Sequence, residues 1–454
     1  MSIFSFRAGM RRNAFSLAAA AGLVALTAAP AAAVPAYAVQ TGMACSACHV
    51  GAFGPQLTPF GRQFKLEGYT MRAGDKFTAP VSAMAVFSFV HTAKDRAEPP
   101  AEHYGLNDNG GLDEASFFLA GGFGSHFGSF AQVTFDGVGR SIAWDNLDLR
   151  AIMHTTLEGD DLLLGLTLNN NPGIQDVWNT LGAWGFPYTD SDLMPGPDAG
   201  TVMDGGLAQT VLGTSVYAWW NQSIYAEAGL YWMPGSGFMQ AVGSDPSDAG
   251  GIMAGAAPYF RIAYSKDYGE QNFEVGVFGL FTGIYPDNDR STGKSDHYSD
   301  VGVDASYQFT GDGTNTYTVN ARYTHEDQDL SASYLLDNAS MRSNSLEEFR
   351  IDGSYYWHNM IGGTIGIFDT WGPTDPLLYA DNRTFKPDSQ GFIFQIDGTP
   401  WGRDGSNGDP RFNLRIGLQY VAYTNFNGAD SNYDGLGRSA SDNNTLRIFT
   451  WLAL

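Results

Sequence analysis

The chain is poor in basic residues. Lys and Arg number 25 against 48 Asp and Glu, which gives a formal net charge of −23 over 454 residues. A nucleic-acid-binding protein needs basic patches that contact phosphate, so this charge balance argues against a nucleic-acid partner. The chain also has only two cysteines, which cannot build a disulfide-dense scaffold.

Long hydrophobic runs are missing after the first 38 residues, and the mean hydropathy is only −0.19. This excludes a bundle of membrane helices. It does not exclude a membrane β-barrel, because barrel strands carry apolar residues at only every second position. The 56 glycines and the aromatic content of 14% are typical of an all-β protein with many turns.

The first 38 residues are a predicted secretory signal peptide. Three arginines precede an Ala-rich apolar run over residues 14–34, and Ala36-Tyr37-Ala38 is a small-x-small cleavage signal. Cleavage after Ala38 would leave a mature chain that begins at Val39. If the segment stayed uncleaved, its apolar run could instead span a bilayer.

One motif carries chemistry, Cys45-Ser46-Ala47-Cys48-His49. Two thiols three positions apart can each form a thioether with one haem vinyl group, and the adjacent histidine then supplies an iron ligand. We predict one covalent haem c on Cys45 and Cys48, with His49 as the proximal ligand. A disulfide is the plainer alternative, whereas a structural zinc would need a second ligand pair that no further cysteine supplies.

The distal haem ligand stays open at this stage. Met43 and Met71 lie nearest to the motif in sequence, although methionine more often fills irregular packing. His358 is a further candidate, on a lumen-facing register beside a predicted periplasmic turn. Met194, in a long loop, is equally open.

Residues 39–78 form a predicted haem-bearing plug segment. About 40 residues rarely bury a core by themselves, so another part of the chain or a partner must cover the haem. Within the segment, Thr58 to Leu66 predicts a short helix with Thr58 as N-cap and Pro59 in the first turn.

Residues 79–454 alternate between apolar and polar side chains in sixteen candidate strands. These are 80–92, 113–123, 126–137, 145–154, 161–169, 208–220, 223–233, 257–265, 271–282, 299–309, 315–325, 346–358, 360–369, 389–397, 412–424 and 444–454. Connections after odd strands are mostly long and those after even strands mostly short, with 138–144 and 398–411 as exceptions. This asymmetry predicts an antiparallel outer-membrane β-barrel with both termini periplasmic and lipid around its wall. A secreted two-sheet protein is the alternative.

Two expectations concern the barrel lumen. The longest connection, 170–207, is expected to fold inward as a constriction because it is so aromatic and apolar; it contains Trp178, Trp184, Phe186, Pro187, Tyr188, Met194 and Met203. Glu348, Arg350, Asp352 and Arg415 fall on lumen-facing registers, where they would meet the plug or the haem propionates. A lumen network without haem contact is the alternative.

The order of parts resembles the fused cytochrome–porin family of outer-membrane iron oxidases. Three stretches carry the resemblance: Gln40 to His49 with Leu57 to Lys65 behind it, Asn170 to Tyr188, and Asn413 to Tyr420 with Ser441 to Leu446. The resemblance implies one c-type haem lodged in a barrel. It also implies electron transfer across the outer membrane, from extracellular Fe(II) or another small donor to a periplasmic carrier such as a soluble c-type cytochrome.

The expected function is therefore electron transfer through one covalent haem c, and Asp- and Asn-rich loops would draw cations toward the mouth. Whether the chain acts as an Fe(II)-oxidising enzyme stays open. Two other functions remain: a porin for small solutes with a haem-bearing plug, and outward electron export to an extracellular acceptor.

Overall fold

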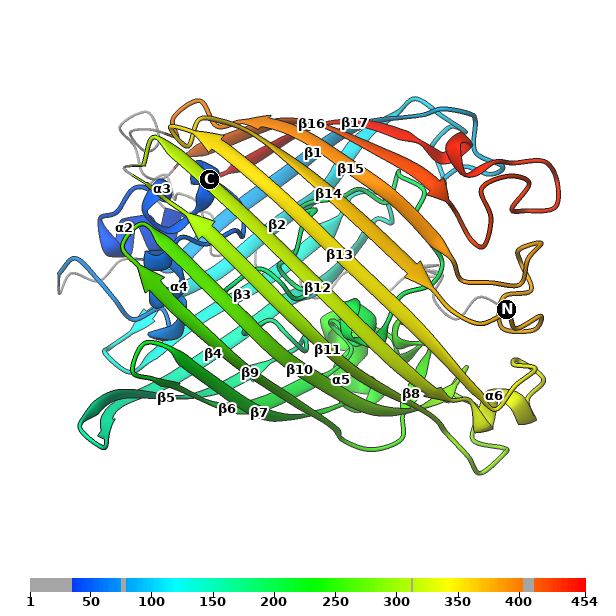
Figure 1. Ribbon diagram of the computed structural model, residues 1–454, viewed down its shortest axis with the longest axis horizontal. Helices are drawn as coiled ribbons and strands as arrows, with labels where there is room; N and C mark the ends of the chain where they lie inside the picture. The colour runs from blue at the N-terminus through cyan, green and yellow to red at the C-terminus, as the bar shows by residue number, and fades with distance from the viewer. Residues whose placement is uncertain (1–34, 75–78, 312, 403–411) are drawn as a thin grey trace.

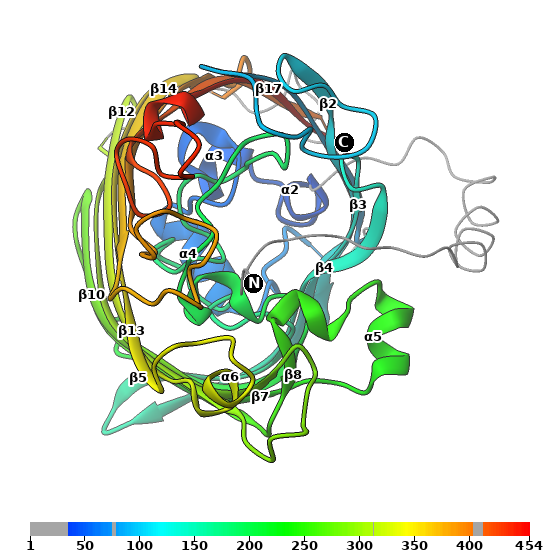
Figure 2. The same cartoon turned by 90° about the vertical axis from the view of Figure 1, so that its right-hand side faces the viewer.

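The strands close into one antiparallel barrel in a computed structural model that describes residues 35–74, 79–311, 313–402 and 412–454. The first strand, β1, pairs with both β2 and the last strand, β17, so the sheet has no free edge (Figures 1 and 2). Most of the predicted signal peptide, residues 1–34, lies outside the described residues. None of the described helices is long and apolar enough to cross a membrane.

Most strands have ten residues or more and neighbour the next strand in sequence. They are β1 Val81–Thr92, β2 Asn109–Phe123, β3 Phe127–Asp136, β4 Ser141–Leu157, β5 Asp160–Asn169, β6 Leu212–Trp220, β7 Ile224–Trp232, β8 Gly251–Met253, β9 Ala257–Tyr268, β10 Gln271–Pro286, β11 Asp296–Phe309, β12 Asn315–Asp329, β13 Ser343–Trp357, β14 Ile361–Trp371, β15 Ser389–Gly398, β16 Asn413–Asn425 and β17 Thr445–Ala453. Each predicted strand corresponds to one of the long strands.

Two of these seventeen strands share one place in the wall. The three-residue β8 and the longer β9 both pair with β10, where Ile284 faces Met253 and Leu280 faces Tyr259, and the register shifts by two residues between the two segments. The described chain therefore fills sixteen strand positions, and the prediction of an antiparallel barrel of about sixteen strands is confirmed.

The wall is apolar outside and polar inside. Ile365, Ile396 and Val216 are more than half exposed on outward registers, whereas Arg261 and Arg447 on inward registers are fully buried. An exterior of this kind requires lipid around it, because exposed side chains of this size would otherwise leave a broad apolar belt in water. The barrel is therefore membrane-spanning.

Tight turns gather at one end of the barrel and long connections at the other (Figure 1). At the tight end, Asn221 and Gln222 both have positive φ, and the Ser223 N–H donates to the Trp220 carbonyl at 3.0 Å, as in a tight hairpin turn. The C-terminus lies at this same end (Figure 1). The long connections carry the short helices α5 Ser236–Val242 and α6 Ser331–Leu335 and the short helical turns η2 Val202–Gly206, η3 Pro246–Ala249 and η4 Ala440–Asn443.

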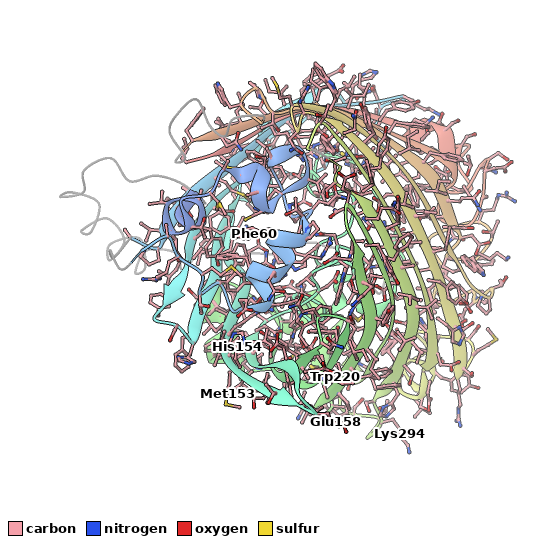
Figure 3. The ribbon with its side chains drawn as sticks, turned by 60° about the vertical axis from the view of Figure 1, so that its left-hand side comes forward. Phe60, Met153, His154, Glu158, Trp220 and Lys294 are labelled. Carbon is pink, nitrogen blue, oxygen red and sulfur yellow. The ribbon has the colours of Figure 1, made fainter. Side chains whose placement is uncertain are left out.

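The plug segment lies inside the ring of strands, toward the tight-turn end (Figures 1 and 2). It contains α2 Pro35–Thr41, α3 Cys45–Cys48, η1 Val50–Ala52 and α4 Pro59–Leu66. The predicted helix is α4, and the Thr58 hydroxyl caps it by accepting from the Gly61 N–H at 3.2 Å. Past its end, Glu67 Oε2 lies 2.7 Å from Nε2 of His154 on β4 (Figure 3), which fastens the plug to the wall.

Residues next to the predicted signal-peptide cleavage point take part in this packing. The Tyr37 ring stacks on Tyr69 with 5.3 Å between ring centroids, and its hydroxyl donates to the Ser129 carbonyl at 2.6 Å. Cleavage after Ala38 would remove Tyr37, so the mature plug would then be held without these contacts.

A positive charge on the lipid face tests the membrane-spanning wall. Ile365 is 55% exposed near the middle of β14, and a lysine at such a depth costs about 2–4 kcal/mol. We expect Ile365→Lys to lower the unfolding free energy in lipid vesicles by this amount. Leu436→Lys, at a loop position that is 91% exposed, should change nothing. Equal stabilities of the two variants would contradict a lipid-facing β14.

Candidate functional site

The two cysteines of the Cys45-x-x-Cys48-His49 motif lie at the ends of α3, and the motif packs against α4 and the residues just before it. The Thr58 N–H donates to the Cys48 carbonyl at 2.9 Å, and the His49 backbone pairs with Leu57. Gly61 permits this close approach, because a Cβ there would lie 2.2 Å from the Cys48 carbonyl oxygen. The helix that follows the motif therefore fixes the position of its last cysteine.

The barrel wall holds the loop after the motif. Arg415 on β16 donates to the Gly51 carbonyl at 3.2 Å and pairs with Asp397 at 3.3 Å. Its guanidinium lies 5.6 Å from the ring centroids of both Phe53 and Tyr356. The expected contact between Arg415 and the plug is confirmed. The guanidinium of Arg415 thereby joins the plug to β16 and, through Asp397, to β15.

The donor set around the motif fits one covalent haem. Cys45 and Cys48 are free, half-buried thiols. Burial lowers the pKa of His49 to about 4; Arg415 acts in the same direction, and the Gly54 carbonyl opposes it. The imidazole is therefore neutral near pH 7, the form that ligates iron. Its Nδ1 is buried without a hydrogen-bond partner among the described residues.

The structure separates the candidates for the distal ligand. The Met71 carbonyl accepts a hydrogen bond from the Gln40 side chain at 2.7 Å, and Met43 is 42% exposed just beyond α2. Neither observation tests iron ligation, so Met43 and Met71 stay predictions for the distal ligand. The His358 ring packs on outward-facing Trp357 at 4.6 Å between centroids, away from the lumen register expected for it. Met194 packs among aromatic residues of its own connection, 170–207, and of the loop after β16.

Sequence reasoning missed a methionine in the wall beside the plug. Met84 on β1 accepts a hydrogen bond from Trp451 Nε1 at 3.2 Å, and Trp451 packs edge-on against Phe53 of the plug at 5.0 Å. The inward register of Trp451 on the last strand was a sequence signal for this contact. Met84 lies near Trp451 because β1 pairs with β17, where Met84 faces Ala453 and Val86 faces Trp451, and the sequence does not show this pairing.

The long connection after β5 folds into the lumen as expected. Its Ile174, Trp178, Leu181 and Met203 are all at most 3% exposed. It also interlocks with the plug, since Asn179 accepts from the Leu57 N–H and donates to the Pro55 carbonyl, both at 2.9 Å. We call residues 170–207 the inward loop.

Lys65 is the second tie between the plug and the inward loop. Its ammonium group donates to the carbonyls of Ile174 and Asp176 at 2.7 and 2.9 Å and lies 4.5 Å from the Trp184 ring centroid. Burial lowers the pKa of Lys65 to about 7, with Arg150 acting in the same direction. One buried amine therefore carries much of the contact between the two elements.

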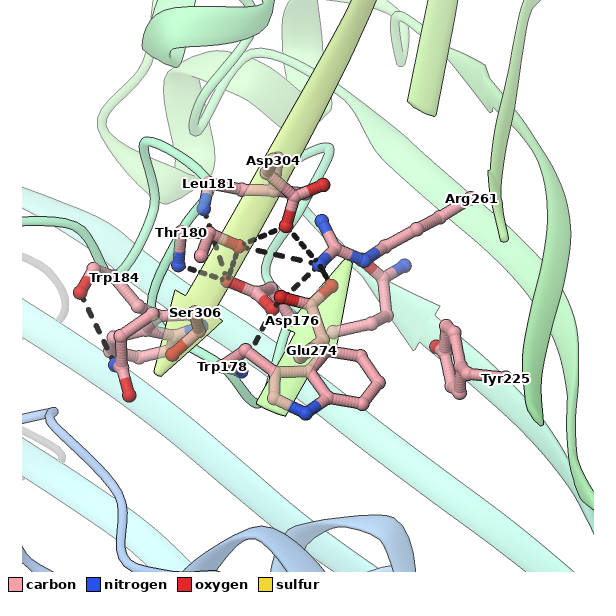
Figure 4. Close-up of polar contacts among 12 residues, drawn as sticks. Asp176, Trp178, Thr180, Leu181, Trp184, Tyr225, Arg261, Glu274, Asp304 and Ser306 are labelled. Atoms are coloured by element: carbon pink, nitrogen blue, oxygen red, sulfur yellow. Dashed lines mark hydrogen bonds and ion pairs between the residues drawn. The ribbon is translucent and has the colours of Figure 1, made fainter. Parts of the chain in front are cut away.

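A buried ion cluster fastens the inward loop to the wall (Figure 4). Arg261 on β9 lies 2.6 Å from Asp304, 3.2 Å from Glu274 and 3.5 Å from Asp176 of the loop. The Thr180 hydroxyl donates to Asp304 at 2.6 Å. Removing Arg261 would leave three carboxylates around an empty space, so this cation is required for the loop to stay inside.

The tip of the inward loop binds a ladder of carboxylates on β11 to β13. The N–H groups of Val202 and Met203 donate to Glu326 and Asp300 at 2.7 and 2.6 Å. Arg322 and Arg350 pair with Asp204 at 2.8 and 2.9 Å and also with Glu348. Burial alone would raise the pKa of Asp204, but these two arginines hold that pKa well below its usual range.

Of the four lumen residues expected to meet the plug or haem propionates, the structure brings only Arg415 to the plug. Glu348 and Arg350 hold the inward loop, and Asp352 accepts from Asn320 at 3.4 Å. The reason is geometric: these three lie on β13 at the level of the loop tip. No group of three or more His, Cys, Asp or Glu side chains in the described chain is arranged to hold a metal ion.

Comparisons with known proteins add no family. No protein-family model matches the chain, and no curated protein matches it. Among solved structures, OmpT of Vibrio cholerae is similar with a TM-score of 0.43 and 9% identity over 84% of this chain and 99% of that one. OprB of Pseudomonas putida gives 0.46 and 12% over 82% and 93%, and an anion-selective porin from Comamonas acidovorans 0.42 and 11% over 82% and 99%.

The charge of Lys65 predicts a pH dependence of the plug. Its pKa in the folded state, about 7, is below the value of about 10.4 in an unfolded chain, so the unfolded state binds more protons between these values. Stability of the plug should therefore rise with pH in this window, by at most about 1.4 kcal/mol per pH unit. Hydrogen exchange of α4 amides, corrected for intrinsic rates, measures it.

Lys65→Met is the matched control for that measurement. It keeps the apolar stem and removes the titrating group, so the slope between about pH 7 and 10 should vanish. A variant with the wild-type slope would show that another group causes it.

Gly61→Ala tests whether α4 braces the cysteine motif. Alanine favours a helix by about 1 kcal/mol over glycine, but overpacking against a backbone oxygen costs about 1–3 kcal/mol. We expect faster exchange of the α3 and α4 amides. Gly74→Ala should leave exchange unchanged, because no atom lies within 4 Å of its added Cβ. Slower exchange in Gly61→Ala would show that propensity outweighs packing.

Proposed function

We propose that the protein transfers electrons across the bacterial outer membrane through one covalent haem c, most specifically from extracellular Fe(II) to a periplasmic carrier. The observation that carries this proposal is that the c-type haem attachment motif sits on a plug held inside a membrane-spanning barrel. Haem c, when bound, supplies a one-electron carrier. The periplasmic partner would be a soluble carrier such as a c-type cytochrome.

The chain's own residues would perform four tasks. Cys45 and Cys48 would hold the group covalently, and neutral His49 would supply the proximal ligand to iron. Arg415 would keep the segment after the motif against the wall. Met43 or Met71 would serve as the distal ligand, and a thioether there would raise the potential relative to a second imidazole.

The filled lumen supports a relay rather than bulk passage. The plug and the inward loop are joined to each other at Lys65 and Asn179, and the loop is joined to the wall at Arg261 and Asp204. Because these contacts are buried and charged, moving the loop aside would expose several unpaired ions. Electrons, unlike solutes, need no open channel.

The choice of Fe(II) rests on the outer mouth. Acidic residues outnumber basic ones in the long connections, which raises the local concentration of cations. Carboxylate and carbonyl oxygens suit brief contact with a hard metal ion without tight retention. Ferric product would form outside the cell, where its precipitation does least harm.

Cysteine variants test attachment. Cys45→Ser and Cys48→Ser should each weaken covalent haem, and the double variant should abolish it, in a host able to mature c-type cytochromes. Haem staining of the denatured band is the measurement. His49→Ala should keep the stain and lose the low-spin spectrum, because only the iron ligand is removed. A colourless wild-type band would overturn the proposal.

Mixing Fe(II) with the oxidised protein tests the donor. The haem spectrum should become reduced, and the rate should fall as salt rises, because the acidic mouth attracts cations over a screened distance of about 10 Å at 0.1 M. Reduction by a periplasmic cytochrome but not by Fe(II) would instead indicate outward electron export to an extracellular acceptor.

A second candidate function is passage of small solutes. It is favoured by the porin-like barrel itself and by a cavity of about 220 Å³ that remains between the inward loop and the wall. Planar-bilayer conductance distinguishes the two functions: a relay predicts little or no current through wild-type protein, and a porin predicts open-channel steps.

A further inference from the structure

The lumen keeps one polar chamber that neither the plug nor the inward loop fills. Its volume is about 220 Å³, and it is bounded by the loop on one side and by β12 and β13 on the other. Asn179, which also holds the plug, forms part of its boundary. Gly182 and Gly185 of the loop face it without side chains, and this leaves room for a ligand.

Two hydrogen-bond donors in the chamber have no protein partner. Arg322 uses Nη2, and Arg350 uses Nε and Nη2, to bind Asp204 and Glu348. The Nη1 group of each arginine has no partner among the described residues. A Cβ on Gly182 would lie 3.2 Å from Nη1 of Arg322, so the absence of a side chain there keeps this donor accessible.

Two carboxylates in the same chamber are equally short of partners. The Asp190 side chain accepts no hydrogen bond from the described residues and is exposed to the chamber. Asp352 accepts only one long bond, from Asn320 at 3.4 Å. It stands two residues from Arg350 on one face of β13, a separation of about 7 Å. Free donors and free acceptors therefore lie within reach of one small molecule.

We propose that this chamber binds a small zwitterion of the size of an α-amino acid. Its carboxylate would accept from the Nη1 groups of Arg322 and Arg350, and its ammonium group would donate to Asp352 and Asp190. A ligand with a single charge would satisfy one pair and leave the other unpartnered, which costs binding energy. The proposal is independent of the haem and of any electron transfer.

Calorimetry on the purified full-length protein in detergent tests it, with L-alanine as the ligand and propionate and ethylamine as its single-charge fragments. Alanine should bind saturably and more tightly than either fragment. Asp190→Asn and Asp352→Asn should each weaken alanine binding about tenfold, the loss of one charge-assisted hydrogen bond. The Asp190 side chain makes no hydrogen bond or ion pair with the described residues, so its variant should still fold, as heat-modifiable gel migration can verify.

Asp430→Asn, in an outer loop away from the chamber, is the matched control and should bind alanine as the wild type does. Absence of saturable alanine binding, fragments that bind as tightly as alanine, or wild-type affinity in both chamber variants would each overturn the proposal. Haem staining and Fe(II) reduction are separate readouts, so failure here leaves the electron-transfer proposal standing.

Discussion

The rest of the structure depends on the need to pair the charged side chains that the barrel wall buries in its lumen. Inward registers of the wall carry charged side chains such as Arg261, Arg415 and Arg447, and these are fully buried. A buried charge is tolerated only with opposite charges or hydrogen bonds around it. Wall residues supply some of these opposite charges and hydrogen bonds, and the inward loop and the plug supply the others. The wall therefore requires both elements as partners.

Arg447 shows how this requirement organises the loop. It donates to the carbonyls of Thr189 and Asp190 at 2.7 Å each, and pairs with Asp113 at 3.0 Å. Together with Arg261 near the start of the loop and Arg322 near its end, it fixes the loop at three separated points. A loop held in this way offers fixed contact points, and the plug uses them through Lys65 and Asn179.

Alternation predicted all sixteen strand positions because lipid outside and polar groups inside impose a period of two on every strand. The same pattern placed Arg415 inward, but it could not say that Gly51 lies opposite. It also could not show that Glu348 and Arg350 hold Asp204, because that depends on the path of a 38-residue connection with no periodicity. The Cys45–His49 motif predicts haem attachment because thioether chemistry fixes its spacing, and haem attachment stays a prediction.

The location of the Cys45–His49 motif determines from which end of the barrel a bound haem could be reached. Cys45 and Cys48 remain half-exposed at the end of the barrel that holds the tight turns and the C-terminus, whereas the inward loop closes the lumen above them. A group attached there would be covered by protein toward the outer mouth and reachable from the periplasmic side. Under the proposed electron transfer, an electron from outside would have to cross packed protein, and the buried contacts of Arg261, Lys65 and Arg415 would keep that path at a fixed length.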